Sequence, residues 1–184
     1  WNLDDFTIGM GWEGRDSRGW SPGMHLIADG SIGDLNDLEV GTAGVTGEMV
    51  ELAARRGNVE IFKWLIGHGA EALLDVSAAP AAVAAAHGGH AEILALLGAH
   101  GFPGLLDGDE EGVTALHEAA RCGHRHVAKW LLSYGGVVDV RDDYGVEPLH
   151  YAAIHGHSDV VRLLIDATAD VSTLDPNGFD PLLH

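Results

Sequence analysis

Two stretches of this sequence decide its fold: residues 109–120 read DEEGVTALHEAA, and residues 142–153 read DDYGVEPLHYAA. The second stretch follows the first by 33 residues, and Asp175 opens a further copy at the same interval. Gly123-His124 also recurs as Gly156-His157. Self-similarity at a fixed period of this length predicts a stacked solenoid of repeats.

Each copy continues in the same way, with an apolar run at residues 127–132 and again at 160–165. The combined pattern resembles the ankyrin repeat, which runs D-x-x-G-x-T-P-L-H-x-A-A, then G-H, then an apolar run and a closing glycine. His117 and His150 hold the histidine position of that pattern. The resemblance implies an all-α solenoid of about four helix-turn-helix repeats joined by short β-hairpin fingers. It also implies a protein-binding module without catalytic activity.

The energetics of a single repeat also favour stacking, whatever family the repeats resemble. One repeat of this length holds too few apolar side chains to offset the conformational entropy of ordering its backbone. The remaining burial must come from neighbouring repeats. Paired alanines at 53–54, 85–86, 119–120 and 152–153 would let the two layers of helices approach closely. Trp64 and Trp130 begin the apolar stripe of their helices and are expected in the core.

Two regions are expected. Residues 1–47 form an extension rich in glycine and tryptophan, with one short strand expected at 6–8 and a degenerate capping repeat expected to end it. Residues 48–184 form the repeat domain. Its expected repeats are 48–74, 75–107, 109–141, 142–174 and a partial copy at 175–184. Pro80 and Val83 replace the threonine and histidine of the second repeat, so its connecting finger is expected to be irregular.

Composition narrows the classes of partner. The chain has 28 acidic and 10 basic residues, a formal net charge of −18. This disfavours binding to nucleic acid and to anionic membrane surfaces, both of which reward clustered lysine and arginine. A protein with a basic patch is the natural complement. No apolar run is long enough to predict insertion into a membrane.

One cysteine and the lack of an Asn-x-Ser/Thr sequon favour an intracellular location, in the cytoplasm or an organelle interior. The start at Trp1 suggests a processed N-terminus or a fragment.

Three features could indicate a nucleotide site, a metal site or a catalytic nucleophile, but each is better explained by a structural role. Residues 9–14, GMGWEG, fit the dinucleotide pattern but precede a segment that makes a poor helix. The twelve histidines mostly occupy repeat positions or helix ends, and a metal would need ligands that converge from two segments with a formed second shell. Cys122 has no oriented base that spacing can identify. We therefore predict no enzyme, no catalytic residue, no metal and no cofactor.

The predicted function is protein binding through a concave face that carries acids with tyrosines between them. The resemblance maps the positions that ankyrin proteins leave free for binding, Cys122 among them, and we expect a basic partner segment there. The predicted contact residues are Glu110, Glu111, Val113, Glu118, Arg121, Asp143, Tyr144, Val146, Tyr151, Ile154 and His155. Asp107, Asp109, Asp139 and Asp142 are expected to extend the acidic stripe along the fingers.

An alternative prediction makes the chain a structural subunit fixed in a larger assembly. Trp1, Trp12 and Trp20 would then lie along a neighbouring subunit.

Overall fold

The computed structural model describes residues 22–30, 45–75, 78–167, 169–172, 174–175 and 178–179. Several predictions fall outside these residues: the strand at 6–8, the pattern at 9–14, and the contacts of Trp1, Trp12 and Trp20. Most of the partial repeat at 175–184 lies outside them as well.

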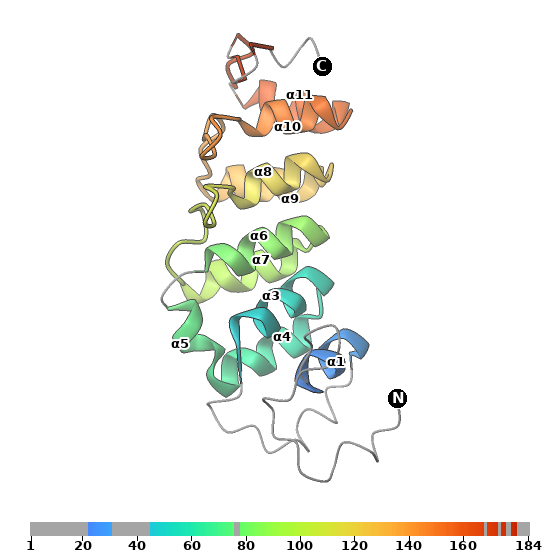
Figure 1. Cartoon of the computed structure of the whole chain (residues 1–184), viewed down its shortest axis with the longest axis vertical. Helices are drawn as coiled ribbons and strands as arrows, with labels where there is room; N and C mark the ends of the chain where they lie inside the picture. Colours follow the sequence, from blue (N-terminus) through green and yellow to red (C-terminus); the bar gives the residue numbers. More distant parts are fainter. Residues whose placement is uncertain are drawn as a thin grey trace.

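Successive helix pairs stack along the long axis of the molecule (Figure 1). The first helix of each pair contacts the first helix of the next, and the second helices form a parallel layer. The first helices are α3 (Gly47–Arg56), α6 (Ala79–Gly88), α8 (Ala115–Arg121) and α10 (Pro148–Ile154). The second helices are α4 (Val59–Leu65), α7 (Ala91–His100), α9 (Arg125–Tyr134) and α11 (Ser158–Asp166). This two-layer arrangement confirms the predicted α-solenoid.

A further helix, α1 (Pro22–Asp29), packs against α3 at one end of the stack. Its Leu26 and Ile27 are buried and join the same core as the repeats. This placement is what a capping element requires, because it covers the apolar side of α3. The assignment of a degenerate capping repeat, like the repeat boundaries, stays a prediction.

Local side chains set where the helices begin and end. Thr46 caps α3 and Asn58 caps α4, each with a side-chain oxygen that accepts a hydrogen bond from a backbone N–H three residues later. At α8 the Nδ1 of His117 accepts from the backbone N–H of Thr114 at 3.1 Å. Gly57 ends α3 with a φ of 69°, a left-handed conformation that glycine adopts without steric cost.

The paired alanines of α3, α6 and α8 are buried, and these helices contact one another in sequence; Ala152 of α10 is buried as well, whereas Ala153 is half-buried. Ala85 and Ala86 of α6 and Ala119 and Ala120 of α8 are fully buried. A side chain of one carbon lets the backbones of successive helices approach closely, and larger residues of the second helices fill the space behind. Trp64 is buried in this core, whereas Trp130 is only partly buried and stacks on the Tyr134 ring at 4.9 Å.

The fingers between repeats are tight turns. In the described part of the chain they form no strand, so the β-hairpin element of the prediction is reduced to its turn. In one finger Asp109 N donates to Val113 O at 3.0 Å, and in the next Asp142 N donates to Val146 O at 3.1 Å. The same turn is built twice, one repeat apart.

The first repeat departs from this plan after α4. A wide turn, η2 (Ile66–Ala70), breaks the helix at Gly69, whose φ is 118°. The short helix α5 (Glu71–Leu74) then takes the place of a finger. Leu74 is buried, so this helix covers part of the core that a finger would leave open. The sequence predicted an irregular finger for the repeat at 75–107, whereas α5 lies before that repeat.

In the last three helix pairs, a histidine at the corner between the two helices ties that repeat to the one before it. His157 Nε2 lies 2.9 Å from Arg121 O, and His90 and His124 make the same contact with Arg55 O and His87 O. Each ring packs against the corner glycine of the preceding repeat. A Cβ on Gly123 would lie 2.6 Å from His157 Nδ1. Gly57, Gly89 and Gly123 are therefore needed for space as well as for backbone conformation, whereas a Cβ on Gly156 would meet no atom within 4 Å.

Among the described residues, no helix is both long and apolar enough to span a membrane.

Candidate functional site

The two acidic fingers stand side by side. The backbone N–H of Asp143 donates to Glu111 O at 3.0 Å, which joins the finger before α8 to the finger before α10. Glu110, Glu111 and Asp143 are exposed on these fingers. Their charges therefore share one edge of the face formed by α3, α6, α8, α10 and the fingers, which we call the first-helix face.

Two of the acids expected on this stripe have a structural role instead. Asp142 is buried, and its Oδ1 accepts from Tyr144 N and Val146 N at 3.0 and 2.8 Å. Asp109 makes the equivalent bonds with Glu111 N and Val113 N. Their prediction as surface charges was wrong for Asp142 and only partly right for the half-buried Asp109, because both carboxylates close the finger turns.

The aromatic and apolar residues differ in their exposure. Tyr144 at the finger is 67% exposed, and Ile154 at the end of α10 is 51% exposed. Tyr151 is half-buried and donates its Oη–H to Asp142 Oδ2 at 2.8 Å. Burial, followed by this hydrogen bond and the charge of Asp142, raises the pKa of Tyr151 to about 12. Tyr151 is thus a fixed part of the face, while Tyr144 is free to meet a partner.

An ion pair that the sequence did not reveal supports the second finger. Arg141 Nη2 lies 2.9 Å from Glu147 Oε1, and Glu147 is almost fully buried. Glu147 takes the position that Thr114 holds one repeat earlier, so an ion pair stabilises the finger before α10. Among the described residues, Arg141 forms its ion pair with Glu147 and not with the exposed acids of the same finger.

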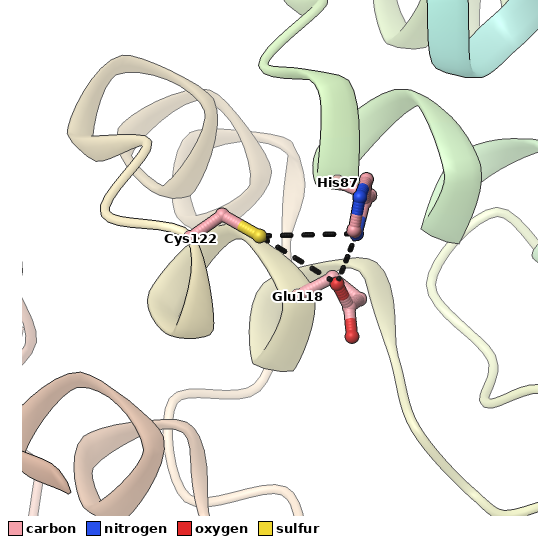
Figure 2. Close-up of side chains that lie close together, drawn as sticks. All are labelled: His87, Glu118 and Cys122. Carbon is pink, nitrogen blue, oxygen red and sulfur yellow. Dashed lines mark hydrogen bonds and ion pairs between the residues drawn. The ribbon is translucent and has the colours of Figure 1, made fainter. Parts of the chain in front are cut away.

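A cluster of polar side chains lies at the C-terminal ends of α6 and α8, away from the fingers (Figure 2). His87 comes from the end of α6, whereas Glu118 and Cys122 come from α8 and its C-terminal cap. His87 Nδ1 lies 3.0 Å from Glu118 Oε2. The Cys122 Sγ lies 3.8 Å from each of these two atoms.

Arg121 lies against the same cluster. Its Nε donates to Glu118 Oε1 at 2.9 Å, and its Nη2 donates to Glu118 Oε2 at 2.8 Å. Nη2 also lies 3.0 Å from His87 Nδ1. That nitrogen either accepts from Arg121 or donates to Glu118, because one ring nitrogen cannot do both.

The surroundings set the charge of each group. Burial favours the neutral form of Glu118, but the hydrogen bonds and charges of Arg121 and His87 outweigh it, so the pKa of Glu118 is lowered. Burial is also the largest influence on Cys122 and raises the pKa of its thiol, which Arg121 only partly opposes. The site thus presents a carboxylate beside a protonated thiol.

The resemblance placed Glu118, Arg121 and Cys122 at positions left free by the repeat. His87 was considered only with His90, as a pair of closely spaced histidines, and was not included among those positions. His87 is the residue of α6 that corresponds to Arg121 of α8, since each directly follows a buried alanine pair. This shared position after the alanine pair could have identified His87. Binding positions were assigned from the repeat pattern only for α8 and α10, and the same assignment for α6 would have included His87.

The other predicted contact residues lie where the resemblance places them, on the fingers and the first helices. Val113 and Val146 are half-buried in the finger turns. His155 follows α10, is exposed, and directs its Nδ1 to Tyr151 O at 2.9 Å. Whether these residues contact a partner stays a prediction.

Comparison with known proteins places the chain. No curated protein matches it. A family model described as ankyrin repeats in three copies matches residues 50–142, and a second ankyrin repeat model matches residues 128–165. The first match alone covers more than half of the chain and spans helices α3 to α9. Ankyrin repeats are in general protein-protein interaction modules and are typically non-catalytic. Matched over most of its helix pairs, the chain belongs to the ankyrin repeat family.

Proposed function

We propose that this ankyrin repeat protein holds a basic segment of a partner protein against its first-helix face, with the acidic fingers as the electrostatic edge of the site. The observation that carries the proposal is the set of exposed, unneutralised carboxylates on two neighbouring fingers. In the described part of the chain none of them forms an ion pair. They are Asp107, Glu110, Glu111, Asp139 and Asp143.

The difference between the buried and the exposed acids of the fingers supports a basic partner. Acids needed by the scaffold, such as Asp142 and Glu147, are buried and satisfied by hydrogen bonds or by Arg141. None of the exposed acids of the same fingers is buried, although Asp139 accepts a hydrogen bond from Asp170 N at 3.2 Å. Like charges held at short range raise the free energy of the unbound protein, and a basic segment would relieve this repulsion.

Tyr144 offers an apolar contact to a partner, in addition to the electrostatic attraction of the acids. It is the most exposed large apolar residue in the described part of the chain and lies in the same finger as Asp143. A rigid aromatic side chain beside charges is typical of the residues that dominate binding energy at protein interfaces. A Lys- or Arg-rich segment with an apolar residue would use both features.

The test begins with peptides selected for binding to the chain from a random displayed library. The chosen peptides should be enriched in lysine and arginine. Their affinity should fall about tenfold when Glu110 and Asp143 are both reversed to lysine, since two exposed charge contacts contribute about 0.2–1 kcal/mol each and reversal turns attraction into repulsion. The salt dependence of binding should also become shallower.

A matched control separates the site from overall charge. Glu92 of α7 and Asp166 of α11 are exposed on the second-helix layer. Reversing both to lysine changes the net charge by the same amount but should leave affinity almost unchanged. Equal weakening in the two double variants would mean that the peptides respond to net charge, and the assignment of this face would then fail.

A further inference from the structure

We propose that His87 Nδ1, Glu118 Oε2 and Cys122 Sγ form a binding site for a divalent transition metal of the zinc type, with its fourth coordination position open to solvent. The site needs no partner protein and is independent of the function proposed above. It meets the condition that spacing alone could not satisfy, because its ligands converge from two different helices.

The geometry is close to that of a coordinated ion. In a tetrahedral site with Zn–N and Zn–O of about 2.0–2.1 Å and Zn–S of about 2.3 Å, neighbouring ligand atoms lie roughly 3.3–3.6 Å apart. Here the nitrogen-to-oxygen distance is 3.0 Å, and the two distances to sulfur are 3.8 Å. Side-chain shifts of a few tenths of an ångström would bring all three atoms into the coordination shell.

The ligand types point to zinc among the common divalent ions. A thiolate and an imidazole favour zinc over magnesium and calcium, which prefer oxygen. Glu118 is held as a carboxylate by its neighbours. The side chains of His87 and Glu118 are 40% and 15% exposed, so an ion can enter from one side while the helices shield the other.

Arg121 provides a second shell. Its Nε–H to Glu118 Oε1 bond uses the carboxylate oxygen that the metal does not need. This contact can persist and orient the carboxylate, as second-shell partners of metal ligands commonly do. Its Nη2, now at 2.8 Å from Oε2, must withdraw toward solvent. Arg121 is about one third exposed, so room for that movement exists.

Binding exchanges one proton for one metal ion. The thiol of Cys122 loses its proton to solvent as the Sγ–metal bond forms, and no electron transfer is involved. His87 binds through the lone pair of Nδ1 and therefore carries its ring proton on Nε2. Glu118 needs no proton change.

The repeat scaffold does not account for this arrangement. The histidines that the scaffold uses, at the corners and at the start of α8, direct their nitrogens to backbone atoms of a finger or a neighbouring repeat. His87 instead directs Nδ1 to side chains of the next repeat. At the position of Cys122, the corresponding residue of α6 is Gly88. Neither ligand is required for stacking.

The experiment titrates the full chain, kept reduced, with Co²⁺ and then displaces the cobalt with Zn²⁺. The chain has one cysteine, so a thiolate-to-cobalt charge-transfer band reports Cys122 alone. We expect this band to saturate at one Co²⁺ per chain and to disappear when Zn²⁺ is added in equimolar amount. Cys122→Ser should abolish the band, and His87→Gln should weaken Co²⁺ binding about tenfold or more.

His155→Gln is the matched control, because His155 is exposed on the same face but lies outside the cluster. It should bind Co²⁺ as the unchanged chain does. Urea unfolding of each variant checks that the loss of the band is not a loss of the fold. Cobalt binding without the charge-transfer band, or with an affinity that His87→Gln leaves unchanged, would overturn the proposal.

Discussion

The substitution Gly123→Ala tests how successive repeats are locked together. Gly123 has a φ of 74°, and a Cβ at this position would lie 2.6 Å from Nδ1 of the His157 ring. That ring is held by its contact with Arg121 O at 2.9 Å, so it cannot move away without losing this hydrogen bond. The methyl group therefore meets both an unfavourable backbone conformation and a fixed neighbour.

The magnitude follows from these two costs. A left-handed alanine costs about 1 kcal/mol relative to glycine. Overpacking against a fixed ring costs about 1–3 kcal/mol more. Gly156→Ala isolates the first cost, because Gly156 has a φ of 73° and its Cβ would meet no atom within 4 Å. We expect a loss of about 2–4 kcal/mol for Gly123→Ala and of about 1 kcal/mol for Gly156→Ala.

The assay is urea unfolding followed by circular dichroism and tryptophan fluorescence, with coincident transitions as the condition for a two-state fit. In a His157→Ala background the ring is gone, so Gly123→Ala should cost no more than Gly156→Ala does. The coupling between positions 123 and 157 should therefore be about 1–3 kcal/mol. Equal losses for the two glycine variants, or a cycle without coupling, would refute the proposed packing of histidine on glycine.

Two further predictions concern buried polar groups. His117→Ala should lower the free energy of unfolding by about 2–4 kcal/mol, because Thr114 N and Val146 O each lose a buried partner; a loss below 1 kcal/mol in urea unfolding would contradict the assignment. Tyr151 should titrate near pH 12, and its folded pKa above the ordinary value of 10 means that it stabilises the fold fully below pH 10 and loses that contribution as pH rises toward 12. Tyr151→Phe should remove the last step in the tyrosinate absorbance titration, and Asp142→Asn should move that step to lower pH; a titration unchanged in both variants would count against the Tyr151–Asp142 hydrogen bond.

The fold could be predicted because its determinants repeat. Ala119 and Ala120 occupy the same repeat positions as Ala152 and Ala153. Because the same pattern occurs twice in succession, it predicts both the helix pair and the stacking of one pair on the next. Asp109 and Asp142 were recognised as finger residues for the same reason. The burial of Asp142 and the partial burial of Asp109 were not predicted. The sequence pattern is the same whether the aspartate carboxylate accepts hydrogen bonds from its own turn or faces solvent.

The polar cluster could not be predicted, because it depends on the spatial register of α6 against α8. His87 and Glu118 are 31 positions apart, which is not the repeat period, and their contact requires the side chains to lean across the helix interface. The ion pair between Arg141 and Glu147 escaped notice for a similar reason. Glu147 takes the place of a threonine, and its side chain is buried only in the folded protein.

The most direct test of the proposed binding function is to map a selected basic peptide on the chain by amide chemical-shift perturbation. We expect the largest shifts on residues 107–113 and 139–146, on the fingers, with smaller ones along α8 and α10. The second-helix layer of α7, α9 and α11 should remain unperturbed. Shifts confined to that layer would contradict the claim that this protein binds its partners through the first-helix face.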